Sequence, residues 1–377
     1  MREFDDSLVT MRGLMEATGY RFIDPPILQP ANIFIDLAGE DIRGRMFLTT
    51  TPGGEELCLR PEFTIPVCLH HIATGAAERS GAYGYMGPVF RHRPAGIASE
   101  FAQAGVESIG REDHEAADAE ILSLALSCLR TFGEAAPDIR IGDQDLFYAV
   151  VDGLDLPVAW RRRLKAACGD RARLDTLIGQ LAGAGETENH DGRAGLLSAL
   201  EGADHGAARG LVEDLLSIAG ISVVGGRSAG EIAERFLEQA TFAAGSGARP
   251  EEAEVLSRFL DIAGAPDKAV EEIAALAGAA GLDIDDSLAV YERRIALMAE
   301  RNISFERMRF AADFGRRLDY YTGFVFELRD PARPKRGPTI GGGRYDRLLR
   351  LLGAEKDVPA VGFSVWIERL PREGEGA

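Results

Sequence analysis

The amino-acid sequence predicts an α+β fold in which strand-forming segments at both ends of the chain flank a long helical stretch. Strand patterns occur at residues 57–59, 139–143 and 308–313. From about residue 144 to residue 303 apolar residues recur with helical spacing, and this stretch is rich in alanine and acidic residues. We therefore expect a core built from residues 1–143 and 304–377, with residues 144–303 as an inserted helical subdomain.

The composition narrows the possible classes of protein. With 377 residues, 46% of them hydrophobic, the chain can form two domains or one large domain with an insertion. A net charge of −18 lowers the expectation of a nucleic-acid partner, which needs a basic surface. There is no apolar run of membrane-spanning length and no apolar signal region at the N-terminus, so a cytoplasmic protein without membrane contact is expected. The four cysteines are scattered without a C-x-x-C pair, which predicts buried free thiols and no metal site.

Two segments of the N-terminal part carry candidate functional residues. Pro25 and Pro26 lie in a stretch with alternating apolar residues, which predicts a strand at an edge or interface or, alternatively, a proline-stiffened loop. Further along, a strand runs into Arg60-Pro61-Glu62-Phe63-Thr64, and a helix is expected to begin near Pro66. A Glu and a Thr just past a strand end suit a ligand-facing position, and a helix cap by Thr64 is an equal alternative.

Residues 82–110 predict two strands separated by a loop. Gln103 and Glu107 are four apart on the second strand and therefore share one face. A Gln and a Glu on one face suit an ammonium or imidazolium ligand. The alternative is a solvated strand face.

The C-terminal part contains the most distinctive stretch, TIGGGRYD, which begins at Thr339. Thr339 and Ile340 are predicted to end a strand, and the glycines that follow to form a turn or allow close approach to a ligand. Four leucines between residues 348 and 352 predict a helix, which is followed by PAVGF and then by Glu368-Arg369. The glycines are not a nucleotide P-loop, because no Gly-Lys-Ser/Thr follows them.

This stretch resembles the third motif of class II aminoacyl-tRNA synthetases, in the version found in histidyl-tRNA synthetase. The resemblance lies in the order of its parts: GGGRYD, the leucine helix, PAVGF and then Glu-Arg. Residues 82–110 are similar to the second motif, and the stretch around Pro25-Pro26 to the first, which builds the dimer interface in that family. RRLDYYTGFVFE resembles the signature R-G-L-D-Y-Y-x-x-x-V-F-E, with Arg317 in place of the usual Gly. The resemblance implies a class II synthetase-like antiparallel sheet flanked by helices.

The same resemblance implies a histidine pocket. In the family, the residues that match Glu62 and Thr64 hold the amino group of histidine, and the arginine that matches Arg316 faces the carboxylate. One of the two adjacent tyrosines lines the imidazole pocket. The residues implied in this way are Glu62, Thr64, Arg91, Gln103, Glu107, Arg316, Tyr320, Tyr321 and Tyr345. Arg344 is expected to matter less, because a turn arginine is more often solvated.

Other features depart from the synthetase pattern. The loop RHRPAGIASEF lacks the usual Glu and the basic residues that meet ATP and tRNA, and Phe63 replaces a Gly. Trp366 stands where the family keeps a glycine, and an indole buries roughly 150–250 Å² that a nucleotide would need. The chain ends at Ala377, where synthetases continue into an anticodon-binding domain.

A synthetase-like chain with these departures resembles the family of ATP phosphoribosyltransferase regulatory subunits. That resemblance implies a non-catalytic chain without a cofactor that acts in the first step of histidine biosynthesis. Its partners would be the short-form catalytic subunit, whose activity requires it, and L-histidine as feedback inhibitor. It would form a homodimer within a hetero-oligomer, without tRNA. Two alternatives are a truncated synthetase-like ligase that activates an amino acid with ATP, and a free-standing histidine sensor.

Overall fold

The computed structural model describes residues 2–37, 42–75, 79–134, 136–183, 223–224, 227–228, 249–316 and 320–371. The chain divides into two compact units. The first comprises Met1–Val150, Cys168–Arg171 and Phe259–Ala377, and the second comprises Val151–Ala167 and Ala172–Arg258. That residues 144–303 form one inserted subdomain stays a prediction. Within it, residues 259–303 group with the first unit.

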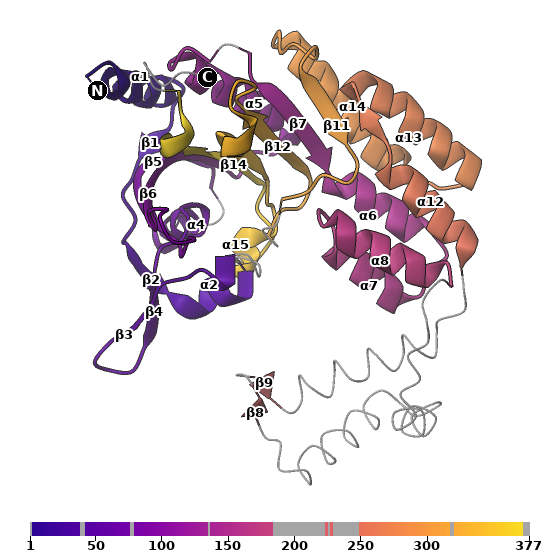
Figure 1. Cartoon of the computed structure of the whole chain (residues 1–377), viewed down its shortest axis with the longest axis horizontal. Coiled ribbons are helices and arrows are strands. Elements are labelled where there is room, and N and C mark those ends of the chain that lie inside the picture. Colours follow the sequence, from indigo (N-terminus) through magenta and orange to yellow (C-terminus); the bar gives the residue numbers. More distant parts are fainter. Residues whose placement is uncertain are drawn as a thin grey trace. The chain divides into compact units, whose positions relative to one another are not determined.

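The first unit is built on a sheet that has nine strands among the described residues, in the order β1-β5-β6-β14-β13-β12-β7-β11-β10 (Figure 1). Most neighbouring strands are antiparallel, whereas β1 pairs with β5 and β7 with β11 in parallel. The strands are β1 (Arg21–Phe22), β5 (Gly81–Phe90), β6 (Glu100–Ile109), β7 (Asp138–Asp143), β10 (Ala263–Gly264), β11 (Met308–Ala311), β12 (Phe324–Arg329), β13 (Ile340–Arg344) and β14 (Ala360–Trp366). The predicted class II synthetase-like sheet with flanking helices is confirmed.

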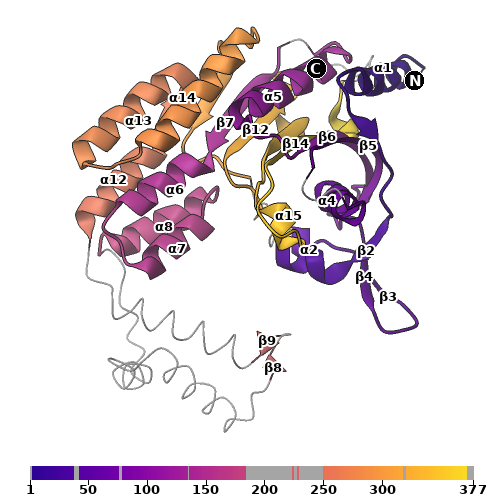
Figure 2. The same ribbon diagram turned by 180° about the vertical axis from the view of Figure 1, so that it is seen from behind.

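Helices cover both faces of this sheet. The long helix α5 (His114–Arg130) packs against β12, β13 and β14, and α14 (Asp285–Glu300) packs against α5 (Figures 1 and 2). On the other side α4 (Thr64–Ala73) packs against the short α15 (Leu348–Leu351). The remaining helical elements of this unit are α1 (Arg2–Ala17), α2 (Ala31–Leu37), α13 (Pro266–Ala280) and the 3-10 turns η1 (Pro334–Arg336) and η2 (Ile367–Arg369), while α6 (Gln144–Gly153) and α12 (Pro250–Leu260) each run across a boundary between the units.

The three consecutive glycines lie inside a strand, so the expected turn at this position is wrong. Residues Ile340–Arg344 form β13, which pairs with β12 on one side and β14 on the other. Strand β13 is buried along its whole length. Glycine suits this place because side chains from other elements lie against the strand, as described below for Gly341.

A second, three-stranded sheet has the order β2-β4-β3, with strands Leu28–Pro30, Glu56–Leu59 and Leu48–Thr50. Pro25 and Pro26 connect β1 to β2 instead of lying in a strand, as the loop alternative predicted. Arg60 is buried behind this connection, and its guanidinium donates to the carbonyl oxygens of Pro25 and Pro88.

The second unit contains α7 (Val158–Ala166), most of α8 (Arg171–Leu181) and a two-stranded pair, β8 (Val223–Val224) with β9 (Arg227–Ser228). Its described core includes the buried side chains of Trp160, Leu164 and Leu174. Most of the described residues between 144 and 303 are thus helical, as the apolar spacing predicts.

Two general features complete the fold. None of the helices in the described ranges is both long and apolar enough to cross a membrane. All four cysteines are free thiols, of which Cys58, Cys68 and Cys128 are buried.

Candidate functional site

One face of the large sheet carries the candidate site, because paired residues of neighbouring strands point to the same side. Tyr83, Glu107, Gly362 and Gly343 form one row across β5, β6, β14 and β13. A Cβ added at Gly362 would overlap the Glu107 carboxylate, and one at Gly341 would overlap the Arg316 guanidinium. Glycine at these two positions lets an acidic and a basic side chain lie flat on the sheet.

Glu107 is the centre of a buried hydrogen-bond network. It is 1% exposed. Its Oε1 accepts from the Thr64 hydroxyl at 2.8 Å and from the Tyr85 hydroxyl at 3.4 Å, and its Oε2 accepts from the Tyr345 hydroxyl. Burial raises the pKa of Glu107 to about 8, although these hydrogen bonds oppose the rise. Burial therefore favours the protonated form of this carboxyl in the free site.

Glu62 caps the helix that follows it. Its two carboxylate oxygens accept from the backbone N–H groups of Thr64 at 2.7 Å and Ile65 at 2.9 Å. Helix α4 consequently begins at Thr64, two residues before the expected start at Pro66. The cap is formed by Glu62, not by the Thr64 side chain, which instead donates to Glu107. Burial raises the pKa of Glu62.

Three tyrosines pack together beside Glu107. The ring centroids of Tyr320 and Tyr321 are 5.0 Å apart, and that of Tyr345 lies 5.8 Å from Tyr320 and 6.4 Å from Tyr321. All three are buried. Arg317, which precedes them in the sequence, lies outside the described residues. The tyrosines provide an aromatic wall next to a carboxyl group.

Two further predicted residues present unsatisfied polar atoms. Gln103 is 1% exposed, and no described residue donates a hydrogen bond to its Oε1. Arg316 has no hydrogen-bond partner among the described residues for its buried Nε and Nη1, and its closest ion-pair contact, to Glu327, is 3.5 Å. Buried polar groups are nearly always paired in proteins, so these atoms indicate a place for a polar ligand.

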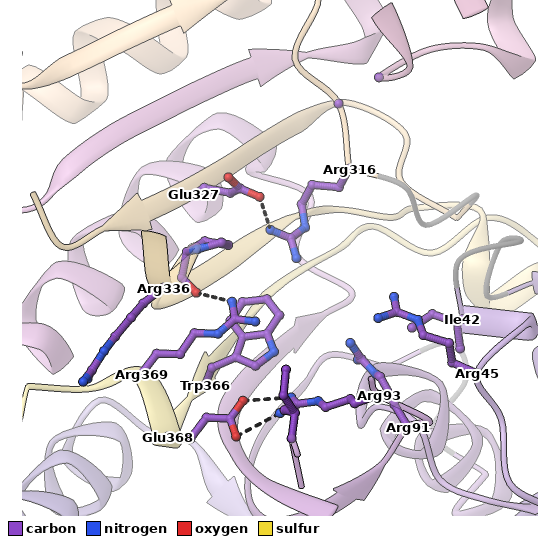
Figure 3. A pocket seen from close by; sticks show the side chains of 14 residues that line it. Ile42, Arg45, Arg91, Arg93, Arg316, Glu327, Arg336, Trp366, Glu368 and Arg369 are labelled. Atoms are coloured by element: carbon purple, nitrogen blue, oxygen red, sulfur yellow. Dashed lines mark hydrogen bonds and ion pairs between the residues drawn. The ribbon is translucent and has the colours of Figure 1, made fainter. Parts of the chain in front are cut away.

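Arg91 and Arg316 also line a cavity of about 760 Å³ that we call the basic cavity (Figure 3). Its charged lining residues are Arg45, Arg91, Arg93, Arg316, Arg336, Arg369, Glu327 and Glu368, and Trp366 is part of its wall. Arg91 Nε donates to the Pro61 carbonyl oxygen at 2.7 Å. Of the nine predicted residues, five lie close to Glu107, namely Glu62, Thr64, Tyr320, Tyr321 and Tyr345, and Gln103 lies further along the same strand face. Arg91 lies in the basic cavity, and Arg316 borders both places.

Arg344 is buried, so the expectation that it is a solvated turn residue is wrong. It is 3% exposed, and its guanidinium donates to Asp118 Oδ1 at 2.6 and 3.0 Å. Asp118 also accepts from Arg294, which in turn pairs with Asp143. The carbonyl oxygen of Arg344 accepts from the Thr322 N–H at 2.8 Å. This network holds the residues next to Tyr321 and Tyr345 in place from the far side of the sheet.

Several contributors were not predicted from the sequence. Tyr85 reaches Glu107 and also shares a hydrogen bond of 2.7 Å with Ser364. The alternation of small and aromatic residues in AYGYMG was a signal that this strand presents tyrosines to one face. Phe63 stacks on Tyr85 with ring centroids 4.4 Å apart and is fully buried, so it packs in the core.

The sequence matches known proteins along almost its whole length. The family model described as histidyl-tRNA synthetase matches residues 2–370. A protein of Brucella anthropi named ATP phosphoribosyltransferase regulatory subunit is 41% identical, over 96% of this chain and 95% of the relative. The protein of the same name from Brucella ovis is 42% identical over the same shares. The chain belongs to the histidyl-tRNA synthetase family, among the ATP phosphoribosyltransferase regulatory subunits.

Solved structures agree on the fold. A Bacillus halodurans protein described as ATP phosphoribosyltransferase regulatory subunit/histidyl-tRNA synthetase has a TM-score of 0.65 at 20% identity, with 98% of this chain and 80% of that chain covered. Histidyl-tRNA synthetase of a Nostoc species has a TM-score of 0.63 at 18% identity, with 98% and 70% covered. At this identity the likeness shows the fold alone.

Proposed function

We propose that this chain is the regulatory subunit of an ATP phosphoribosyltransferase and that it binds L-histidine in the cluster around Glu107. The observation that carries the site is a set of buried polar atoms without a hydrogen-bond partner among the described residues, namely Gln103 Oε1 and the Nε and Nη1 of Arg316. The role is supported by the name of relatives that are 41–42% identical over nearly the whole chain.

The chemistry of the cluster fits the three polar parts of histidine. Arg316 offers unused donors for a carboxylate, and Gln103 offers an unused acceptor for an N–H group. Glu107 offers a carboxyl group that becomes a carboxylate when a cation binds beside it. The tyrosines would contact the imidazole ring. Glu62 contributes indirectly in this arrangement, because both of its oxygens already hold the start of α4.

The regulatory role implies an assembly. We infer a cytoplasmic hetero-oligomer in which this chain, as a homodimer built through the Pro25-Pro26 region, associates with the short-form catalytic subunit and is required for its activity. Histidine binding then inhibits the complex by favouring one of two states with different affinity for histidine. The chain itself is inferred to be non-catalytic in the transfer.

The test uses the complex reconstituted from this chain and the short-form catalytic subunit. We expect transferase activity to appear only when both chains are present, and histidine to inhibit it. Arg316→Gln should keep the complex active but shift inhibition to higher histidine concentration, whereas Arg293→Gln, an exposed arginine of α14, should leave the curve unchanged. A catalytic subunit that is equally active alone would contradict the role. A free-standing histidine sensor would bind histidine but fail to co-purify with the catalytic subunit.

A second candidate is an ATP-dependent amino-acid ligase. The basic cavity beside the cluster favours it, because several arginines suit a triphosphate. Trp366 argues against it, since the indole occupies the wall of that cavity. Pyrophosphate exchange that depends on an amino acid distinguishes the two, because a purely regulatory chain shows none.

A further inference from the structure

The residue that precedes Arg316 is in direct backbone contact with a distant turn. Residues Cys168–Arg171, which we call the α7–α8 turn, join α7 to α8. A Cβ atom added at Gly169 would lie 2.8 Å from the Gly315 Cα, and one added at Gly315 would lie 2.7 Å from the Gly169 Cα. Contacts this short are essentially absent from folded proteins, so a side chain at either position would push the two backbones apart.

Both sides of this glycine contact are fixed by further contacts within the first unit. A Cβ atom added at Gly142 of β7 would overlap the carbonyl oxygen of Phe314, so the segment that leads to Arg316 also rests on the large sheet. The turn groups with the first unit, and its Arg171 donates to the Leu260 carbonyl oxygen at 3.0 Å and to Asp261 Oδ1 at 2.8 Å. Because both segments are held in this way, neither can move aside freely to make room for a side chain.

The Arg316 side chain depends on its backbone for its position. Its guanidinium lies over Gly341 of β13, where a Cβ atom would overlap it. Among the described residues its Nε and Nη1 have no hydrogen-bond partner, and Glu327 lies 3.5 Å from it (Figure 3). A guanidinium with so few polar contacts of its own points where the main chain that carries it directs it.

We propose that the α7–α8 turn positions Arg316 for the carboxylate of the amino-acid ligand, through the contact of Gly169 with Gly315. Gly169 is a positioning residue that acts through Arg316. A binding group has to be held within about 0.5 Å of its productive geometry, which is less than the shift that a Cβ atom at this contact would force. The inference rests on the proposed histidine site. Because α7 and most of α8 belong to the second unit, it also gives that unit a connection to the ligand through the chain itself.

The first experiment measures the binding of L-histidine and of L-histidinol to the full chain by calorimetry. Histidinol has a hydroxymethyl group in place of the carboxylate, so it does not need Arg316 as a carboxylate partner. Gly315→Ala adds the Cβ atom at a position without a left-handed backbone angle. It should weaken histidine at least about tenfold, as expected when a charge-assisted hydrogen bond is misplaced, and leave histidinol binding as in wild type. Gly169→Ala should give the same result from the other side of the contact.

A third variant separates the contact from backbone strain. Gly133 has a φ of +77°, close to the +80° of Gly169, but a Cβ atom added there would have no atom within 4 Å. Gly133→Ala should therefore leave both affinities unchanged. Equal losses for histidine and histidinol in Gly315→Ala, or unchanged histidine binding in both Gly315→Ala and Gly169→Ala, would overturn the proposal. If Arg316→Gln weakens histidine in the same series while these two variants do not, the histidine site stands and the positioning role alone fails.

The second experiment needs no ligand, so it tests the positioning role even if histidine does not bind. Phenylglyoxal, which reacts with accessible guanidinium groups, is added to the folded protein, and modification of Arg316 is followed by mass spectrometry. The Arg316 side chain is 11% exposed and that of Arg293, the internal reference, is 60% exposed. Relative to Arg293, modification of Arg316 should be slow in wild type and several-fold faster in Gly169→Ala and Gly315→Ala. Equal relative rates in wild type and both variants would show that the turn does not position Arg316.

Discussion

Replacing Glu107 by Gln should remove a large part of the pH dependence of stability. In the folded protein the pKa of Glu107 is raised from the ordinary 4.5 to about 8, because the carboxyl is buried. Because the pKa is raised, the folded state binds more protons than the unfolded state at pH values between 4.5 and about 8. The stabilisation that this proton provides is complete below pH 4.5 and is lost as the pH rises through about 8.

The size of the effect follows from the shift. Each unit of pKa difference corresponds to about 1.4 kcal/mol, so the full shift is worth about 5 kcal/mol. Between pH 6 and pH 8 the wild-type protein should lose about 2 kcal/mol of unfolding free energy relative to Glu107→Gln. Gln has nearly the same shape, keeps an acceptor for the surrounding hydroxyls and does not titrate. Glu62 is present in both proteins, so the difference between them reports on Glu107.

The assay is urea unfolding of both proteins at a series of pH values, followed by circular dichroism. The expected result is two curves that approach each other at low pH and separate as the pH rises, with the wild type losing stability faster. Parallel pH profiles would refute the reasoning, because they would mean that Glu107 titrates alike in the folded and unfolded states. A wild type that gains stability relative to the variant as the pH rises towards about 4.5, with parallel curves above that pH, would show that the hydrogen bonds from Thr64, Tyr85 and Tyr345 outweigh burial.

Three further predictions concern the site and its support. Glu107→Ala should weaken histidine binding by roughly 2–5 kcal/mol if the carboxylate pairs with the ligand cation, and calorimetry showing unchanged affinity would remove it from the site. Arg344→Ala should destabilise the fold by about 3–5 kcal/mol in urea, because it leaves the buried Asp118 short of a partner. Arg350→Ala breaks an exposed pair with Asp357 and should lower the unfolding free energy by under about 1 kcal/mol. Equal losses of stability in Arg344→Ala and Arg350→Ala would contradict the role of burial.

Local sequence patterns predicted several of the elements and drew attention to candidate residues that the structure brings onto one face of the sheet. The alternation that placed Gln103 and Glu107 on one face holds in the structure, because side-chain direction repeats every two residues along any strand. The helical spacing of Phe4, Leu8, Met11 and Met15 likewise predicts a helix that Gly19 ends. Helix α1 runs to Ala17, and Gly19 has a φ of +96°, which glycine adopts readily. Such local patterns depend only on near neighbours in the chain.

The tertiary structure decided what the local patterns left open. The glycines after Thr339 belong to a central strand and not to a turn, because Arg316 and the neighbouring strands occupy the space that side chains would need. Arg344 is buried because that strand faces Asp118 of α5, a partner more than two hundred residues away in the sequence. The basic cavity likewise joins arginines that no short stretch contains. Contacts of this kind depend on which strands pair and in which register, and this is set by packing across the whole unit instead of by the spacing of residues within one segment.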